Sequence, residues 1–322
     1  MLFSIIVPVY NRPDEIVELL ESLCDQAYTH FEVIIVDDGS FNRCEEQVAE
    51  YRDRLDIRYF YKENSGQGFS RNFGFERANG DYFVVFDSDC IIPPDYFKTV
   101  NAELLKKPID AWGGPDRSHP SFNPIQKAIN YAMTSPFTTG GIRGNKKHIG
   151  TFHPRSFNMG ISRDVFNKTG GYRITRMGED LEFSIRIIRE GFNVELIEDA
   201  YVYHKRRTNF CQFFKQLHFF GRARINIQRF YPDEVKPVHL LPAIFTLSLA
   251  FLLISAWISI SLFLIILFFY MLFCSVVFIH SYYLSNSAKI ALLSCLASFI
   301  QLTAYGTGFL QELYSFRNND SK

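Results

Sequence analysis

The chain lacks several features that mark common classes of protein. Its 34 basic and 34 acidic side chains balance, so it has no cationic excess to bind nucleic acid. Its six cysteines include no C-x-x-C pair, which argues against a zinc site or a disulfide framework, and we expect reduced thiols. The N-terminus lacks the pattern of a signal peptide, because the short apolar run at 4–9 is soon followed by Pro13 and polar residues.

Charge is nearly missing from the C-terminal quarter. Within residues 238–316 only Lys289 and Glu312 are charged, and 240–279 has no charged residue. As helix, that uncharged run is about 60 Å long, roughly twice the hydrocarbon thickness of a bilayer. We expect two antiparallel passes with a turn near 255–261. A weaker apolar segment at 290–310, diluted by small and polar residues, leaves the choice between two and three passes open.

The segment before this tail is basic and aromatic. Residues 205–229 hold no acid, and aromatic and leucine side chains recur there at helical spacing. This pattern indicates an amphipathic helix in the membrane interface, with a core-packed helix as the alternative. Basic residues beside the membrane segments predict that the N-terminal region faces the cytoplasm. The basic side chains are Lys205, Arg206, Arg207, Lys215, Arg222, Arg224 and Arg229.

The N-terminal part alternates apolar strands with helical segments. The strand-like runs at 3–9, 32–36, 57–61 and 82–86 are separated by helix-periodic stretches, which predicts an α/β fold with a doubly wound, mostly parallel sheet. Ligands bind such sheets at the carboxyl ends of the strands. No G-x-G-x-x-G motif marks a dinucleotide site. The polar residues expected at that edge are Tyr10, Asn11, Asp37, Asp38, the loop 64–68, Asp87 and Asp89.

These polar residues fit the chemistry of a metal-bound nucleotide. Asp87 and Asp89 can share one divalent cation, although a solvated Asp-Ser-Asp turn is the alternative. Asp37 and Asp38 can accept hydrogen bonds from a base or ribose, or serve only a turn at Gly39. Arg71 can pair with a phosphate or remain a solvated helix charge.

Four motifs in one order carry a resemblance. SIIVPVYN at 4–11, VDDGS at 36–40, NSGQGFSRNFG at 64–74 and DSD at 87–89 together resemble family 2 glycosyltransferases of the GT-A fold. The resemblance covers roughly residues 3 to 230. It implies an inverting transfer from a nucleotide-diphospho-sugar, with Mg²⁺ or Mn²⁺ held at the D-x-D. Ser70 stands where the family commonly has alanine, and we expect that difference to be neutral.

The resemblance also assigns roles to residues. Asp180 is implied as the base that deprotonates the acceptor hydroxyl, and Glu179 as the residue that orients the acceptor or its neighbours, although both acids suit simple capping of a helix start. His204 is a third metal ligand in some relatives, and a structural histidine is the alternative. Asp164 is expected to cap a short helix ending at Gly170. The implied nucleotide-sugar contacts are Pro8, Tyr10, Asn11, Asp37, Asp38, Gly66, Arg71, Asp87, Ser88 and Arg222.

These inferences predict a membrane-anchored enzyme in four parts. They are a catalytic domain at 1–205, an interfacial helix at 206–237, membrane helices at 238–312 and a polar tail. We expect transfer of one sugar from a UDP-sugar to a membrane-presented, polyprenyl-diphosphate-linked glycan in surface polysaccharide synthesis. The Q-x-x-R-W motif of processive synthases is absent, but a processive synthase and an inactive sugar-nucleotide-binding scaffold remain alternatives. The glycine-rich basic segment at 138–153 is either a surface loop or a flap over the site.

Overall fold

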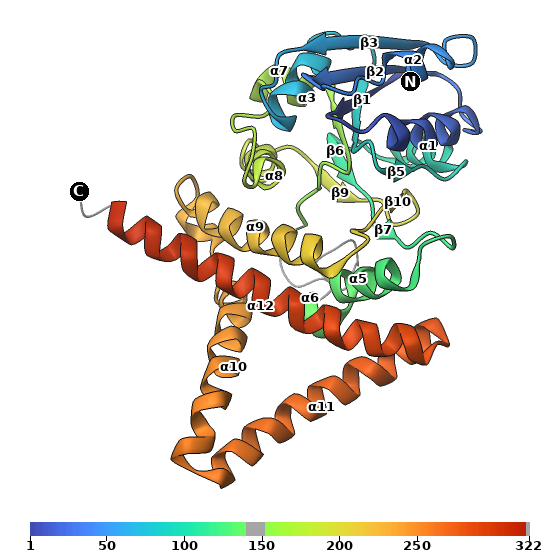
Figure 1. Cartoon of the computed structure of the whole chain (residues 1–322). Coiled ribbons are helices and arrows are strands. Elements are labelled where there is room, and N and C mark those ends of the chain that lie inside the picture. The colour runs from blue at the N-terminus through green and yellow to red at the C-terminus, as the bar shows by residue number, and fades with distance from the viewer. Residues whose placement is uncertain (140–151, 320–322) are drawn as a thin grey trace. The chain divides into compact units, whose positions relative to one another are not determined.

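The computed structural model describes residues 1–139 and 152–319 (Figure 1). The chain forms two compact units. The first contains the described residues up to His119 and from 152 to Lys205; the second contains 120–139 and 206–319. Most of the glycine-rich basic segment (Gly140, Gly141, Arg143, Gly144, Lys146, Lys147, His148 and Gly150) lies outside the described residues.

The first unit is built on a mixed sheet with the strand order β3-β2-β1-β4-β8-β6-β9. Strands β1 to β4 are parallel, whereas β8 runs antiparallel to both β4 and β6. The expectation of a mostly parallel α/β sheet is therefore confirmed. The strands are β1 Phe3–Val9, β2 Phe31–Asp38, β3 Ile57–Lys62, β4 Tyr82–Phe86, β6 Ala111–Gly113, β8 Asn158–Ser162 and β9 Val194–Leu196.

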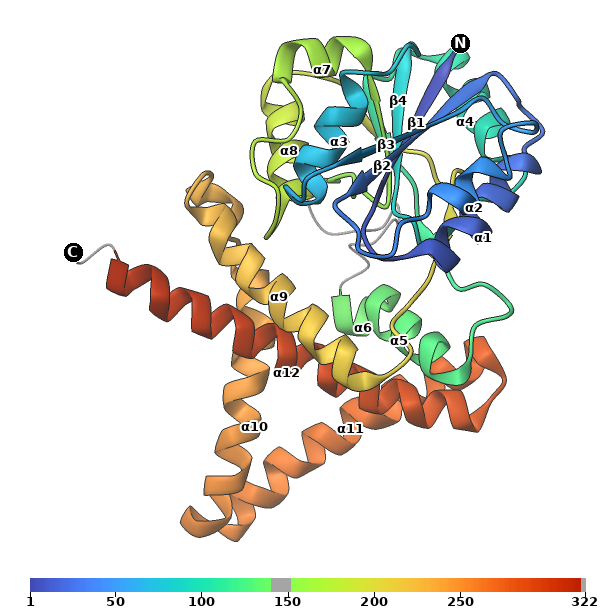
Figure 2. The same ribbon diagram turned by 45° about the horizontal axis from the view of Figure 1, so that its top comes forward.

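Helices cover both faces of this sheet (Figure 2). On one face the apolar side chains of α1 and α4, such as Leu19 and Phe97, pack against β1 and β2. On the other, α3, α7 and α8 contribute Phe75, Val165 and Phe183. Each buried side chain of this size adds about 1.5–3 kcal/mol to folding. The helices are α1 Pro13–Cys24, α2 Glu45–Ala49, α3 Gln67–Phe75, α4 Tyr96–Lys106, α7 Arg163–Thr169 and α8 Glu179–Arg189.

A second, three-stranded sheet completes the first unit. Its order is β5-β10-β7, formed by Cys90–Ile91, Val202–His204 and Asp116–Arg117. In this register His204 lies opposite Cys90, directly beside the D-x-D segment. The small sheet therefore brings together residues more than a hundred positions apart in the chain.

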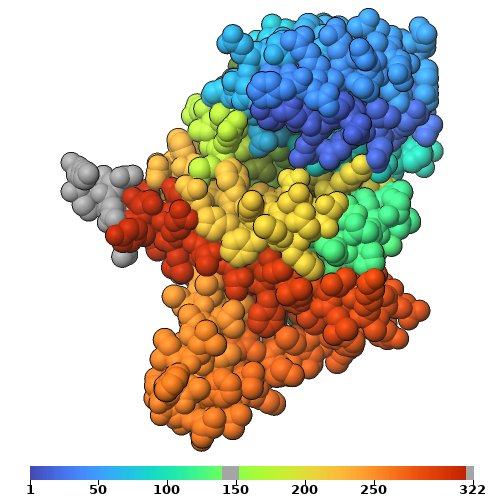
Figure 3. Space-filling view, viewed as in Figure 1, coloured from blue at the N-terminus to red at the C-terminus, as the bar shows by residue number. Residues whose placement is uncertain are grey.

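The second unit consists of helices that meet on α12. Helix α12 packs against α9, α5, α10 and α11, and it lies along α9 over most of the length of α9 (Figures 1 and 3). Two short 3₁₀ turns, Pro232–Glu234 and Pro237–Leu240, link α9 to α10. The helices are α5 Pro124–Thr134, α6 Pro136–Thr139, α9 Phe210–Gln228, α10 Leu241–Ile258, α11 Ile260–Ser285 and α12 Ala288–Asn319.

Three details differ from the sequence-based expectations. Ser162, not Asp164, caps α7, because the Ser162 hydroxyl accepts the Val165 N–H while Asp164 lies inside the first turn. Helix α12 is longer at both ends than the apolar run 290–310. Helices α5 and α6 group with the C-terminal helices, although the sequence placed them within 1–205. The break near 255–261 is confirmed, at Ser259.

Candidate active site

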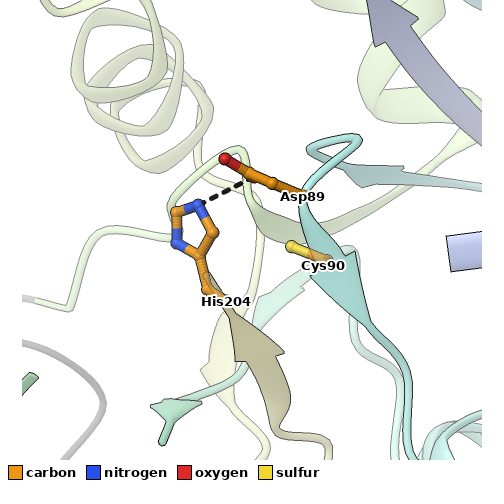
Figure 4. A group of neighbouring side chains, drawn as sticks. All are labelled: Asp89, Cys90 and His204. Atoms are coloured by element: carbon orange, nitrogen blue, oxygen red, sulfur yellow. Dashed lines mark ion pairs between the residues drawn. The ribbon is translucent and has the colours of Figure 1, made fainter. Parts of the chain in front are cut away.

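The two acids of the D-x-D segment lie at the carboxyl end of β4. Asp89 is 6% exposed, whereas the Asp87 side chain is about one-third exposed. Nε2 of His204 lies 3.1 Å from Oδ1 of Asp89 (Figure 4). The same nitrogen lies 3.9 Å from Oδ2 of Asp87. The Asp89 carboxylate and the His204 imidazole therefore lie side by side at the small sheet, and the Asp87 carboxylate lies next to the imidazole from the end of β4.

Polar atoms at this point have unused bonding capacity. In the described part of the chain Nδ1 of His204 is buried without a hydrogen bond, and Oδ1 of Asp89 is buried with the ion-pair contact to Nε2 of His204 but no hydrogen bond of its own. The ring of His204 is held by stacking on Phe157, with centroids 5.0 Å apart. Carboxylate oxygen and imidazole nitrogen are suitable ligands for Mn²⁺, and carboxylate oxygen is the preferred ligand of Mg²⁺. The residues present therefore fit a divalent ion.

Cys90 also lies near this point, but its chemistry is that of a buried thiol. Its Sγ donates to the carbonyl of Phe157 at 3.5 Å. Burial, followed by the nearby charges of Asp89 and Asp87, raises the pKa of Cys90 well above its usual value. A metal-binding cysteine acts as a thiolate, so Asp87, Asp89 and His204 form the better ligand set.

Arg12 supplies a permanent positive charge at the same acid. Its Nη1 donates to Oδ2 of Asp89 at 2.7 Å and also contacts Glu15 at 2.9 Å. Burial alone raises the pKa of Asp89, but the neighbouring His204 and Arg12 more than offset it, and the pKa lies well below its ordinary value. Asp89 is therefore ionised throughout the physiological range.

Arg71 joins the D-x-D segment to the acids that open α8. Its side chain is 1% exposed, with Nη2 2.9 Å from Asp87 and Nη1 3.4 Å from Glu179. The guanidinium also lies over the ring of Tyr172 at 5.3 Å. The expected phosphate contact of Arg71 stays a prediction. The observed contacts make Arg71 a buried link between the two acidic motifs.

Glu179 and Asp180 have different surroundings at the start of α8. The preceding Gly178 adopts φ +97°, a left-handed conformation that glycine adopts at little cost. The Glu179 carboxylate is buried and accepts a hydrogen bond from Gln67. The Asp180 side chain is 22% exposed, with Oδ2 3.5 Å from Nη1 of Arg155. Asp180 is therefore the acid of the pair that another molecule can reach more readily.

The pKa of Glu179 is raised, first by burial and then by the charge of Asp180. Arg71 and Gln67 act in the opposite direction but do not cancel this effect. A carboxylate with a raised pKa takes up a proton more readily than Asp89 does. Glu179 and Asp89 thus differ in electrostatic character.

Asp38 holds the loop that follows β3. Its Oδ1 accepts from the Ser65 N–H and from Nζ of Lys62, each at 2.8 Å, and its Oδ2 accepts from the Gly66 N–H at 2.8 Å. Gly66 has φ +87°, and a Cβ there would lie 2.3 Å from the Thr175 hydroxyl. The expected nucleotide contact of Asp38 is untested, and the geometry shows a turn-forming role.

Asp37 and Asn11 organise the neighbouring turn. Asp37 is buried and accepts from the Ser40 N–H at 2.8 Å and from the Tyr59 hydroxyl at 2.6 Å. Asn11, at φ +53°, accepts from the N–H groups of Phe41 and Asn42. Tyr10 remains 46% exposed at the same strand end. This edge therefore presents an aromatic face on a turn that is already fixed internally.

The remaining predicted contacts divide between the two units. Pro8 and Ser88 lie on the segments that carry Tyr10 and Asp87, at the end of β1 and beyond β4. Arg222 belongs to the second unit, where its Nε pairs with Glu312 at 3.0 Å. Lys205 and Arg229 also have acidic partners, so the charges of 205–229 are compensated in part.

Four residues near the acids were given no individual role from the sequence: Arg12, Gln67, Arg155 and Tyr172. Arg12 follows Asn11 at the same strand end as the acids, so its position was a usable signal. Gln67 stands inside one of the recognised motifs. Arg155 and Tyr172 carry no local pattern, and only the fold brings them to the site.

Comparisons with known proteins identify the family of the chain. A family model described as glycosyl transferase family 2 matches residues 4–170. The uncharacterized glycosyltransferase EpsJ of Bacillus subtilis is 28% identical over 65% of this chain and 62% of its own length. The poly(ribitol-phosphate) beta-N-acetylglucosaminyltransferase TarS of Staphylococcus aureus is 39% identical over 33% of this chain and 18% of its own. The match to a glycosyltransferase of Rickettsia felis spans only 15% of that protein.

Solved structures show the same fold. A mannosyltransferase of Pyrobaculum calidifontis, in complex with GDP-Man and Mn²⁺, aligns with a TM-score of 0.63 and 16% identity, over 97% of this chain and 87% of its own. Residues 1–349 of S. aureus TarS, in complex with UDP-GlcNAc, align with a TM-score of 0.52 and 20% identity, over 99% and 92%. The α/β unit is thus GT-A-like, and the chain belongs to glycosyl transferase family 2.

Proposed function

We propose that the protein is an inverting glycosyltransferase that moves one sugar from a UDP-sugar to an acceptor at the cytoplasmic membrane surface. The acceptor is a polyprenyl-diphosphate-linked glycan used in surface polysaccharide synthesis. One observation carries this proposal. Arg71 contacts both Asp87 and Glu179, so the acids proposed to bind the cation and the acids proposed to serve the proton transfer share one site.

Asp87, Asp89 and His204 would hold a Mg²⁺ or Mn²⁺ ion. Such an ion would supply charge stabilisation for the departing nucleotide diphosphate. Arg12 keeps Asp89 ionised, and stacking on Phe157 keeps the His204 ring oriented toward the acids. The exposed ring of Tyr10 offers a face for a nucleobase at the same strand end.

Asp180 would take the proton from the acceptor hydroxyl. Its partial exposure and its place beside the buried Glu179 suit a base that meets an incoming acceptor. Glu179, fixed by Arg71 and Gln67, would hold the start of α8 in place. Asp180 would attack no carbon itself, in keeping with inversion in a single displacement.

The proposed membrane location of the protein is based on the helices of the second unit. Three of its helices are long and apolar enough to cross a membrane. Their exposed leucine, isoleucine and phenylalanine side chains would be covered by lipid. A processive synthase would use the same site, and TarS is named for a reaction on a polymer. The length of the product therefore separates these two alternatives.

The test uses the full chain in membranes with UDP-GlcNAc, UDP-Glc and GDP-Man, each with and without Mn²⁺. We expect Mn²⁺-dependent binding of one donor, which Asp89→Ala abolishes and Asp180→Asn retains. Asp180→Asn should lose donor turnover, while Asp199→Asn, a change at an exposed acid of the same unit, should not. Donor binding without turnover in the unaltered chain would support the scaffold alternative, and long products would support a processive synthase.

A further inference from the structure

Helix α12 differs from the other two apolar helices in how much of it is covered. By length and composition all three could cross a membrane. In its most apolar stretch, 44% of the residues of α12 are buried in the protein, against 17% for the α10 span and 11% for α11. Much of the apolar surface of α12 is therefore covered by other parts of the protein and is not available to lipid.

Much of that coverage comes from α9, which approaches the backbone of α12 closely. A Cβ at Gly221 of α9 would lie 2.1 Å from the carbonyl oxygen of Tyr305. A Cβ at Gly308 of α12 would lie 2.0 Å from the carbonyl oxygen of His218. Glycine on each helix thus permits close backbone contact between α9 and α12. Because the two helices pack side by side, they must lie at the same depth in a membrane.

The basic side chains of α9 indicate the depth at which both helices lie. Lys215 and Arg229 are exposed, Arg222 and Arg224 are partly exposed, and the first and last of these are about 21 Å apart along the helix. If α9 crossed a hydrocarbon layer about 30 Å thick, Arg222 and Arg224 would lie near its middle. Each arginine at that depth costs about 2.5–3.5 kcal/mol on insertion scales. Helix α9 therefore belongs in the headgroup layer, and α12 with it.

Helices α10 and α11 have the opposite character. Neither contains a charged residue in its bounds, and they turn back on each other at Ser259. Their 18 and 26 residues correspond to about 27 and 39 Å of helix, enough to cross the hydrocarbon layer twice. Trp257 at the turn is 91% exposed, as suits a residue at the far interface.

We propose that α10 and α11 are the two membrane crossings, and that α12 lies at the membrane surface beside α9. The C-terminus then returns to the side of the catalytic unit. This inference rests on the membrane location within the proposed function, but not on the reaction. The partner of the α9–α12 pair is the headgroup layer of a bilayer, where exposed cations such as Lys215 meet lipid phosphate.

The first test maps sidedness in the full chain. Epitope tags at both termini are probed with protease in sealed vesicles of known orientation. Ser259→Cys, in a Cys211→Ser parent, is probed with an impermeant maleimide, with the parent alone as the matched control. We expect both tags to be cleaved from one side and position 259 to be labelled from the other. Cleavage of the C-terminal tag from the side opposite the N-terminal tag would overturn the inference.

The second test measures depth without a tag. Leu272 on α11 and Leu296 on α12 are each 49% exposed, so they form a matched pair. In a Trp257→Phe background, Leu272→Trp should be quenched best by lipids brominated deep in the acyl chain, and Leu296→Trp by those brominated near the headgroup. Equal deep quenching would overturn the inference and leave the glycosyltransferase proposal intact. Release of the chain by alkaline carbonate would overturn this inference and the membrane location together, while donor turnover would still report on the reaction.

Discussion

Two clusters in this protein combine acids with arginines, in opposite proportions. In the first unit Asp87, Asp89, Glu179 and Asp180 outnumber the three arginines that contact them, Arg12, Arg71 and Arg155. In the second unit a single acid, Glu312, is shared by Arg222 and Arg229. The first cluster therefore has anionic charge left for a cation, and the second has cationic charge left for an anion.

The clusters also differ in burial, which sets how strongly each pair contributes. The Arg71 side chain is 1% exposed, whereas those of Arg222 and Arg229 are 36% and 41% exposed. Breaking a buried pair leaves an uncompensated charge and costs about 3–5 kcal/mol, whereas exposed pairs contribute about 0–1 kcal/mol. The comparison predicts that substitutions at the site have large effects and that those between α9 and α12 have small ones.

The largest effect is expected for Asp180→Asn. Loss of a positioned base should lower kcat by about 10²–10⁴-fold, because proton transfer to a placed carboxylate contributes that much. The Kd of the donor should change little, since Asp180 does not belong to the metal-binding set. Steady-state turnover and donor binding, measured on the same preparation, check this. A matching loss from Glu179→Gln with Asp180→Asn nearly inert would assign the base to Glu179 instead.

The second-largest effect is expected for Arg71→Met, which should lower the stability of the protein. Asp87 and Glu179 would lose their shared buried cation, and we expect a loss of about 3–5 kcal/mol in the free energy of unfolding. The control is Arg176→Met, because Arg176 is exposed and contacts Asn64 at 3.3 Å. Chemical denaturation of the detergent-solubilised chain measures both. Equal, small losses in the two variants would show that Arg71 is not the link described.

The sequence revealed the parts of the site that lie in one strand or turn. Asp87, Asp89 and the acids of α8 follow local patterns, and the parallel sheet places them at one edge. The link between them was not predictable, because Arg71 bonds residues 16 and 108 positions away. His204 reaches Asp89 only through the small sheet, whose strands are too short to give a periodic signal.

The sequence predicted the elements whose apolar periodicity is strong. It did not predict the groupings of elements that depend on tertiary packing. The four parallel strands and the break at Ser259 follow from local runs. The grouping of α5 with the C-terminal helices depends on side chains such as Ile129 and Met133 meeting Phe213 and Ala297. Such contacts join distant segments, and no local pattern encodes them.

Arg12→Ala tests the acid cluster of the first unit, and we expect a moderate effect on its affinity for Mn²⁺. Removing a positive charge 2.7 Å from Asp89 should tighten Mn²⁺ binding by about fivefold, because the cation and the guanidinium repel each other across one carboxylate. Isothermal titration without donor measures this, with Arg52→Ala, an exposed position in the same unit, as control. Weaker Mn²⁺ binding would mean instead that Arg12 holds Asp89 in its ligand conformation.

Glu312→Gln should have the smallest effect and tests the helix half of the comparison. The Glu312 side chain is 8% exposed but both arginines are solvated, so we expect a loss of about 1 kcal/mol in the free energy of unfolding. A double-mutant cycle with Arg222→Gln isolates the pair, and donor turnover should be unchanged in the Glu312→Gln single variant. A coupling of several kcal/mol would show that this pair behaves like the Arg71 link. In that case burial would not distinguish the acid cluster around Arg71 from the Glu312 cluster between α9 and α12. The opposite excess of charge in the two clusters would then be the remaining difference between a ligand site and a helix contact.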